Sequence, residues 1–339
     1  MVAAPAAATM LANATREPPM SAGLPRPRPA VVFAVPVLVG LMLTLFAWPS
    51  ARLAPRDLPL GVVGPVPDAF AAGGSFSVHR YADAAAARHG VRQRKVYGAV
   101  VGSSQGTTLY VASAASLLVA QLLEHAFAAP AASGPQARVV DVVPADPQDP
   151  RGAALASSVL PLVLAGIVAG FALGFGLRPG LTQAAGLVAA SVLAGLVAIG
   201  IVQGWLGVLG GSWAENGGVL ALTVLGISAA IAGLGTLIGL WGFLLGAGLM
   251  MVIGNPFSAV SSAPELLPKP VGVIGQLLPP GAGGNLLRST AFFDGAGGAG
   301  HLAVLLAWAV LGLVAVCAGA LRRRPTPPLR PGRGFPGRL

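Results

Sequence analysis

The stretch GGVLALTVLGISAAIAGLGTLIGLWGFLLGAGLMMVIGNPFS, residues 217–258, runs for 42 positions without a charged side chain. A bilayer core about 30 Å thick is crossed by about 20 apolar helical residues, so this stretch is too long for one spanning helix and long enough for two. We expect a turn near Gly233–Gly235 to divide it. Hydrophobic residues make up 55% of the chain and charged residues 9%. Since soluble domains are about 25% charged, the composition predicts an integral membrane protein.

Four further apolar runs are of spanning length, at 30–48, 155–177, 181–203 and 301–320. Only Arg178, Pro179 and Gly180 separate the second run from the third, which predicts a tight helical hairpin. With the two helices of 217–258, the runs predict an α-helical integral membrane protein with six transmembrane helices. Helices 2–5 fall within 155–258.

The first run, 30–48, has two interpretations, a cleaved signal peptide and an uncleaved anchor. The apolar core of a signal peptide is about 7–15 residues long. Here the core has 19 residues and follows a 29-residue leader. These lengths favour an anchor, transmembrane helix 1.

The net charge of +10 is concentrated at the two ends of the chain. Residues 321–339 carry six arginines, and residues 1–29 carry three arginines against one glutamate. Because basic flanks of membrane helices stay in the cytoplasm, we expect 1–29 to be a disordered cytoplasmic tail and 321–339 a basic cytoplasmic tail. Arg178 then lies inside, and residues 57–151 lie outside.

Three other features of the composition indicate the kind of membrane and the partners of the chain. Trp48, Trp205 and Trp213 fall at the predicted outer interfaces, as in an aromatic belt. Abundant Ala, Gly, Pro and Arg with few Lys favours a high-GC bacterial genome, and hence the bacterial plasma membrane, with the lipid bilayer as a partner. The arginines alternate with proline and have no interleaved aromatic residues for base stacking, so we exclude nucleic acid as a partner.

Glycines spaced by four residues predict faces for close helix packing, although a chain with 48 glycines also produces such spacings by chance. The spaced sets are Gly166, Gly170 and Gly174, then Gly235 with Gly239, and Gly242 with Gly246.

Ionisable side chains are absent from the five later spans by these boundaries, apart from His301 at the edge of the last. Ion-coupled transporters keep such residues at membrane depth. Their absence argues against a proton-driven antiporter and favours a hydrophobic or lipid-like substrate.

Residues 57–151 are expected to form an extracytoplasmic α/β domain inserted between helices 1 and 2. Short apolar runs between Gly and Pro predict strands, and DAAAARHGVRQR (83–94) opens with a capping aspartate and predicts a helix. The order is close to β-α-β-α-β-β-α-β. The predicted strands are 57–64, 76–82, 96–102, 108–113 and 137–144, and the helices with assigned bounds are 83–94 and 115–129.

Inside this domain, Gly102-Ser103-Ser104-Gln105-Gly106 matches the G-x-S-x-G pattern of a serine-hydrolase nucleophile elbow. An elbow needs a helix after the serine, whereas the following TTLYV is typical of a strand, so the motif predicts a hairpin turn. The order Ser, Asp, His also cannot be completed, because His301 is the only histidine beyond Asp141. We therefore expect Ser104 not to be catalytic and the chain not to be an enzyme.

Other candidates for chemistry are weak. No spacing singles out a catalytic or metal-binding set, and the single cysteine, Cys317, lies within the last apolar run, so no catalytic, metal or cofactor residue is assigned. The run Arg88, Arg92, Arg94 and Lys95 is interpreted as a solvated helix face that complements the helix dipole, the alternative being binding of an anionic headgroup or a cell-wall polymer. The histidines and acids considered are His79, His89, His125, Asp141 and Asp146.

The segment 259–300 contains five prolines, which forbid one long helix, beside the short apolar pieces VGVIGQLL and NLLRSTAFF. Such pieces are typical of interfacial or re-entrant helices, here on the outer face. The polar Asn285 and Arg288 are candidates to border a substrate exit.

Four stretches together resemble a known family: LPLGVVGP (58–65), RKVYGAVV (94–101), LYVASAAS (109–116) and DVVPADPQDPRG (141–152). With six spans and a large insertion after the first, the chain from about residue 30 to 320 resembles the type-2 ABC exporter permeases. Within these it is similar to the branch of the phage-infection (Pip-like) membrane proteins.

The resemblance implies a permease half that forms a homodimer or heterodimer and exports a hydrophobic or amphiphilic substrate, with energy from a separate ATP-binding subunit. The chain has no G-x-x-x-x-G-K-[ST] phosphate loop of its own. The turn at 178–180 is shorter than the coupling helix that such permeases present. The alternatives are a non-transporting cell-surface receptor or envelope scaffold that uses 57–151, and a membrane-embedded hydrolase.

Overall fold

The computed structural model describes residues 29–65, 74–103, 106–128 and 138–322. It is mostly helical, and within these residues six helices are long and apolar enough to cross a membrane, as predicted. The chain divides into two compact units, Met1–Thr44 and Leu45–Leu339. In the first unit the described structure is the greater part of helix α2 (Pro29–Ala51), whose apolar side chains from Phe33 onward are mostly exposed.

The second unit contains a sheet that has five strands in the described residues, in the order β2-β1-β3-β4-β5. Strand β1 pairs parallel with β2 and β3, and β4 pairs parallel with β5. Strands β3 and β4 are antiparallel, with Ser103 opposite Gly106, which confirms the predicted hairpin. The strands are β1 (Leu58–Val63), β2 (Phe76–Arg80), β3 (Gly98–Ser103), β4 (Gly106–Val111) and β5 (Arg138–Asp141).

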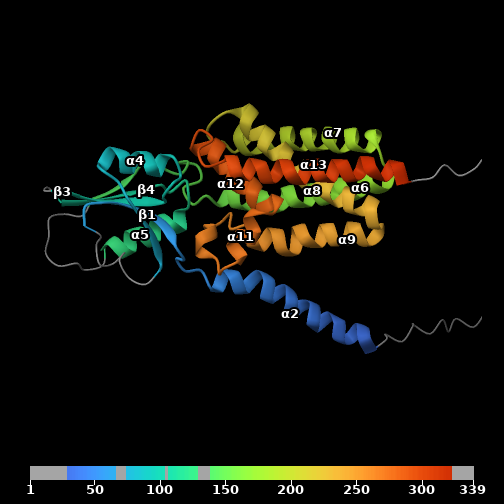
Figure 1. Cartoon of the computed structure of the whole chain (residues 1–339), viewed down its shortest axis with the longest axis horizontal. Helices are drawn as coiled ribbons and strands as arrows, with labels where there is room; N and C mark the ends of the chain where they lie inside the picture. The colour runs from blue at the N-terminus through green and yellow to red at the C-terminus, as the bar shows by residue number, and fades with distance from the viewer. Residues whose placement is uncertain (1–28, 66–73, 104–105, 129–137, 323–339) are drawn as a thin grey trace, which may run out of the picture. The chain divides into compact units, whose positions relative to one another are not determined.

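Two helices cover opposite faces of this sheet (Figure 1). Helix α4 (Ala84–Arg92) begins at Asp83, whose carboxylate accepts a hydrogen bond from the Ala86 N–H at 2.7 Å, as the predicted cap requires. Helix α5 (Leu117–Ala128) packs on the other face, where Leu60, Leu109 and Leu123 are fully buried. Alternation along the strands therefore gives each helix its own apolar core. The helix expected between the first two strands falls around residues 66–73, outside the described residues.

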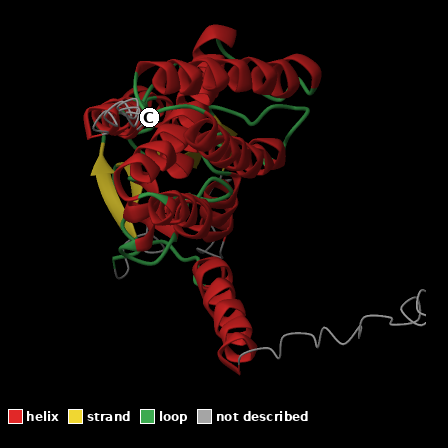
Figure 2. Ribbon diagram, turned by 90° about the vertical axis from the view of Figure 1, so that its right-hand side faces the viewer, coloured by secondary structure: helices red, strands yellow, loops and turns green. Residues whose placement is uncertain are grey.

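Helix α8 is the centre of the membrane-type helices: 14 of its 26 residues are buried, against six of 24 in α6 and five of 19 in α7. The turn between α6 and α7 confirms the predicted hairpin. Figure 2 views these helices with the strands behind them. The long helices are α6 (Ala153–Gly176), α7 (Leu181–Ile199), continued by the π-helix η1 (Gly200–Trp205), α8 (Trp213–Ile238), α9 (Leu240–Gly248), continued by η2 (Leu249–Gly254) and α10 (Asn255–Phe257), and α13 (Ala299–Arg322).

The prediction of a turn near Gly233–Gly235 is wrong. The chain turns at Gly239, whose φ of 68° and ψ of −145° suit glycine, and α8 continues through the earlier glycines. A Cβ at Gly233 would lie 2.8 Å from the Gly312 carbonyl oxygen, and one at Gly235 would lie 2.3 Å from the Phe243 ring. Those two glycines allow close packing and do not reverse the chain.

The helix α8 also begins earlier than expected. Ser212 caps it, with its hydroxyl oxygen accepting from the Glu215 N–H at 3.4 Å. The fourth span therefore includes Glu215 in its first turn, contrary to the expectation that the later spans lack ionisable residues. A carboxylate at this position complements the positive end of the helix dipole.

The glycine spacing in α6 does form a packing face. A Cβ added at Gly166 would lie 2.7 Å from Ile227, and one added at Gly170 would lie 2.9 Å from Ile231, both on α8. A Cβ at Gly174 would meet the ring of Phe243. The absence of side chains at these positions lets α6 and α8 approach closely, as predicted.

The segment 259–300 forms three short helices, η3 (Pro264–Leu266), α11 (Val271–Gln276) and α12 (Pro279–Phe292). Helix α12 begins with two prolines, which its first turn tolerates because those positions lack intrahelical N–H partners. Nearly all its residues are buried, and α8 and α13 lie beside it. Its location at the outer face of a membrane stays a prediction.

Candidate binding site at the junction of the sheet and the short helices

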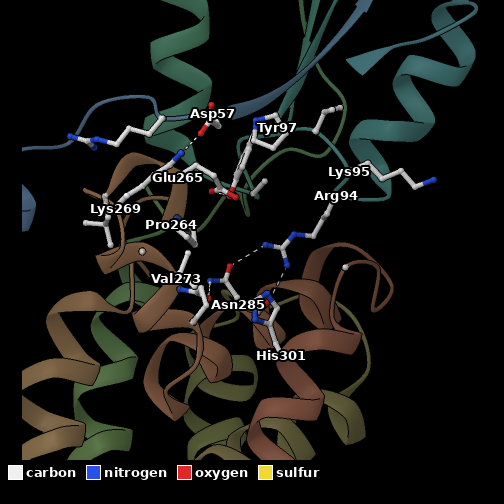
Figure 3. A pocket seen from close by; sticks show the side chains of 18 of the residues that line it. Asp57, Arg94, Lys95, Tyr97, Pro264, Glu265, Lys269, Val273, Asn285 and His301 are labelled. Carbon is white, nitrogen blue, oxygen red and sulfur yellow. Dashed lines mark hydrogen bonds and ion pairs between the residues drawn. The ribbon is translucent and has the colours of Figure 1, made fainter. Parts of the chain in front are cut away.

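A pocket of about 470 Å³ lies where the sheet meets the short helices (Figure 3). Its walls come from four segments: the chain just before and within β1, the turn from α4 to β3, Ala115 before α5, and the region from η3 to the start of α13. The lining residues are Arg56, Asp57, Pro59, Arg94, Lys95, Val96, Tyr97, Ala115, Pro264, Glu265, Leu267, Pro268, Lys269, Gly272, Val273, Gln276, Asn285, Gly297 and His301.

Arg94 crosses from the sheet to α12. Its backbone ends the turn after α4 in the left-handed region, with φ of 56°, which is unfavourable for a residue with a Cβ. Its guanidinium donates to the Asn285 carbonyl oxygen at 3.0 Å, to Asn285 Oδ1 at 3.1 Å and to Ser289 Oγ. The guanidinium carbon lies 5.4 Å from the centre of the Phe293 ring. These contacts stabilise an otherwise unfavourable turn.

The interpretation of the basic run as one solvated face is therefore wrong for Arg94. Arg92 and Lys95 are exposed, and Arg88 lies over the ring of Tyr110 at 5.6 Å. Arg94 differs because the left-handed turn directs it away from the helix surface and toward α12. Its role depends on a residue far along the chain, which the local pattern could not indicate.

Asn285 is the centre of the polar network below the pocket. Its Oδ1 accepts from Arg94 and, at 3.2 Å, from Arg288. Its Nδ2 donates to Gln276 Oε1 at 2.7 Å, and Arg288 donates to the Val260 carbonyl oxygen at 2.6 Å. Asn285 and Arg288 are both buried, so every bond in this network replaces one to water. The two residues singled out from the sequence thus act as a unit.

The two carboxylates of the pocket form their hydrogen bonds and ion pairs with residues other than Arg94. Glu265 accepts a hydrogen bond from the Tyr97 hydroxyl at 2.8 Å, and Asp57 forms an exposed ion pair with Lys269. In the described parts of the chain, neither Arg94 nor Arg288 has a carboxylate within ion-pair distance. The pocket lining contains four Lys or Arg side chains and two carboxylates, so its charge is positive.

Burial also perturbs the titration of the groups at the sheet side. It lowers the pKa of Arg94 by disfavouring the charged guanidinium, an effect that Tyr97 and Glu265 oppose. It raises the pKa of Tyr97, and the negative charge of Glu265 raises that pKa further. Tyr97 is therefore a neutral hydrogen-bond donor at physiological pH, while Arg94 remains a cation whose charge is poorly solvated.

One side of the pocket is apolar and open. Val273 of α11 lines the pocket and is 64% exposed, and Leu277 just beyond that helix is 57% exposed. The indole N–H of Trp308 donates to the Leu277 carbonyl oxygen at 2.8 Å and fixes the end of α11. A basic pocket thus opens beside an exposed apolar helix.

A second pocket, of about 440 Å³, is lined by Arg288, Val260, Asp146, Asp149 and Arg151 among others. Its acids have local structural partners. Asp149 accepts from the N–H groups of Ala153 and Ala154, each at 2.8 Å, at the start of α6. Asp146 accepts from the Gln148 N–H at 2.8 Å. This pocket is therefore a weaker candidate than the first.

The other residues considered for catalysis or metal binding lie apart from the first pocket. Asp141 accepts from the Ser113 hydroxyl, and His125 lies within 2.6 Å of the Gln121 carbonyl oxygen on its own helix. His79 and His89 are exposed. Within the described residues, no three His, Cys, Asp or Glu side chains approach closely enough to hold a metal ion. Ser104 lies outside the described residues, and Cys317 is half-buried in α13.

Sequence reasoning missed Tyr97, Glu265 and Gln276. All three are polar residues in or beside apolar segments, a pattern that can indicate a buried polar site. Their partners could not be identified because they lie far away in the sequence. Tyr97 and Glu265 are 168 positions apart.

Comparisons of the chain with protein-family models, with curated proteins and with solved structures gave no match. The fold and the site therefore define a class, a multi-pass helical membrane-type protein with a small sheet and a basic pocket. They show no family.

Proposed function

We propose that the chain is a membrane permease subunit that exports a hydrophobic or amphiphilic substrate. The observation that carries this proposal is the junction pocket, in which the half-buried Arg94 and the buried Asn285 lie beside the exposed apolar residues of α11. A site with a polar side and an apolar side suits an amphiphile, and the six apolar helices supply the setting. The role is binding and transport, without catalysis.

The proposed location is the bacterial plasma membrane, with both termini in the cytoplasm. The basic ends of the chain support this orientation. The sheet, whose strands lie between α2 and α6 in the sequence, is then extracytoplasmic, and the 177–180 turn is cytoplasmic.

A separate ATP-binding subunit is the proposed source of energy, and a homodimer or heterodimer is the proposed assembly. The support is the resemblance to type-2 ABC exporter permeases, together with the lack of a phosphate-loop motif in the chain. This proposal includes membership of the Pip-like branch.

The test is purification of the full chain from its own membranes in mild detergent, followed by identification of the proteins that remain bound. We expect an ATP-binding subunit whose ATPase activity is coupled to the presence of this chain. Absence of such a subunit contradicts ATP-coupled export. Loss of envelope integrity on deletion, with no partner ATPase stimulated, favours the receptor or scaffold. Labelling by a fluorophosphonate probe that Ser104→Ala abolishes favours the hydrolase.

A further inference from the structure

We propose that the junction pocket binds the anionic phosphate headgroup of a lipid-like amphiphile through Arg94, with Lys95 adding positive charge at the pocket, and that the acyl chain lies on the exposed apolar side of α11. This inference rests on the proposed export function and names the class of substrate. It joins two features of the site, a cation that has no ion-pair partner among the described residues and an apolar surface beside it.

Arg94 is the residue proposed to bind the headgroup. Its guanidinium is held by Asn285 and Ser289, which are neutral acceptors, and Glu265 acts on its charge from a distance, but no carboxylate of the described residues forms an ion pair with it. A poorly solvated charge without a counter-ion is unfavourable, and an incoming anion would relieve that cost. The planar guanidinium also matches the geometry of phosphate oxygens.

The carboxylates of the pocket do not compete strongly with an anionic ligand for the Arg94 guanidinium. Glu265 is engaged by the Tyr97 hydroxyl, and Asp57 by Lys269. Lys95 follows Arg94 in the chain, is exposed and lines the same pocket, but its ammonium is directed away from the Arg94 guanidinium (Figure 3). The lining as a whole carries an excess of positive charge, which favours an anionic ligand.

Helix α11 supplies the surface proposed to bind the acyl chain. Val273 lies in the pocket wall, and Ile274 and Leu277 extend the exposed apolar surface along the same segment. An inorganic phosphate would gain nothing from this surface, whereas an acyl chain would bury it and would therefore bind more tightly. The pocket volume of about 470 Å³ suits a headgroup and leaves the acyl chain outside.

Binding can be measured on the full chain in a neutral maltoside detergent, by native mass spectrometry. Three probes separate the contributions: lysophosphatidylglycerol, lysophosphatidylcholine of the same chain length, and water-soluble glycerol phosphate. We expect the anionic lysolipid to bind about tenfold more tightly than the zwitterionic one, because both carry a phosphate but the positively charged pocket repels the choline cation of the second. Glycerol phosphate should bind more weakly than the anionic lysolipid.

Variants then locate the site. Arg94→Gln should remove most of the preference for the anionic lysolipid, and Lys95→Gln should reduce it. Arg92→Gln is the matched control, because Arg92 is exposed, lies two positions from Arg94 and is not part of the pocket. Val273→Ser should weaken both lysolipids and leave glycerol phosphate unchanged. Lys95→Gln keeps the test decisive if Arg94→Gln does not fold, since Lys95 is exposed.

The inference is overturned if the two lysolipids bind equally, or if Lys95→Gln behaves as Arg92→Gln. Binding of glycerol phosphate as tight as that of the anionic lysolipid overturns the amphiphile and leaves a soluble phosphate. These outcomes are independent of the ATP-binding partner. If an ATPase copurifies but the chain shows no preference for the anionic lysolipid, only the proposed substrate class is overturned. If the chain prefers the anionic lysolipid but no ATPase copurifies, only ATP-coupled export is overturned.

Discussion

Arg94 donates two hydrogen bonds to Asn285, which lies 191 positions further along the chain. One bond goes to the main-chain carbonyl and the other to the side-chain oxygen, at 3.0 and 3.1 Å. The pair ties the turn between α4 and the central strand β3 to the buried helix α12. It thereby joins two of the segments that line the junction pocket (Figure 3).

Arg94→Gln should lower the free energy of unfolding by about 1–3 kcal/mol, because two hydrogen bonds from a charged donor to the buried Asn285 are lost. Thermal unfolding of the full chain in detergent measures the change. The exposed Arg92→Gln should stay within about 0.5 kcal/mol of the wild type. Equal unfolding temperatures for the two variants would show that the Arg94 bonds contribute no stability.

Tyr97 should make stability fall at alkaline pH. Burial raises the pKa of Tyr97 in the folded protein above its ordinary value of 10.0, and Glu265 raises it further. The folded state therefore keeps a proton that the unfolded state loses. The contribution is fully present below pH 10 and is lost as the pH rises above that value.

Unfolding of wild type and Tyr97→Phe should therefore be compared between pH 8 and 11, a range chosen to bracket the ordinary tyrosine pKa of about 10. We expect the wild type to lose stability more steeply than the variant above pH 10. Parallel curves for the two proteins would contradict the assigned burial of the Tyr97 hydroxyl. Tyr81, whose pKa burial also raises, is present in both proteins and cancels in the comparison.

Gly166→Ala should destabilise the packing of α6 on α8. The added methyl group would lie 2.7 Å from Ile227, so the helices must separate, at a cost of about 1–3 kcal/mol. Gly176→Ala is the control on the same helix, because an added Cβ there has nothing within 4 Å. A thermal shift of the same size in both variants would mean that close approach at Gly166 is not required.

Gly239→Ala tests the turn between α8 and α9. No atom lies within 4 Å of the added Cβ, but the φ of 68° with ψ of −145° is a glycine conformation, so strain alone should cost about 1–3 kcal/mol. Gly248→Ala has the same open surroundings and a helical φ of −59°. It should stabilise by about 0.5–1 kcal/mol, because alanine loses less backbone freedom in a helix. If both variants shift in the same direction, the backbone at Gly239 is not the constraint.

The proposed orientation predicts which side of the membrane each segment faces. In a Cys317→Ala background, Gln93→Cys should react with a membrane-impermeant maleimide in intact cells. Pro179→Cys should react only after permeabilisation, since the 177–180 turn is proposed to be cytoplasmic. The reverse pattern would invert the topology and place the sheet in the cytoplasm.

Local sequence patterns determined much of this protein. Uncharged runs of about 20 residues or more predict helices of spanning length, because an apolar helix of that length suits a bilayer wherever the rest of the chain lies. The hairpin of β3 and β4 and the cap at Asp83 were likewise predictable, since turn chemistry and capping involve residues a few positions apart.

The tertiary structure decided the rest. Gly233, Gly235 and Gly239 look alike in sequence, and only the neighbouring helices separate the two that permit packing from the one that turns the chain. Arg94 belongs to a basic run whose local pattern indicates solvent exposure, yet Asn285 and Ser289 hold its guanidinium. The site depends on contacts between segments that are nearly 200 positions apart, and such contacts follow from packing of the whole chain, which no local pattern contains.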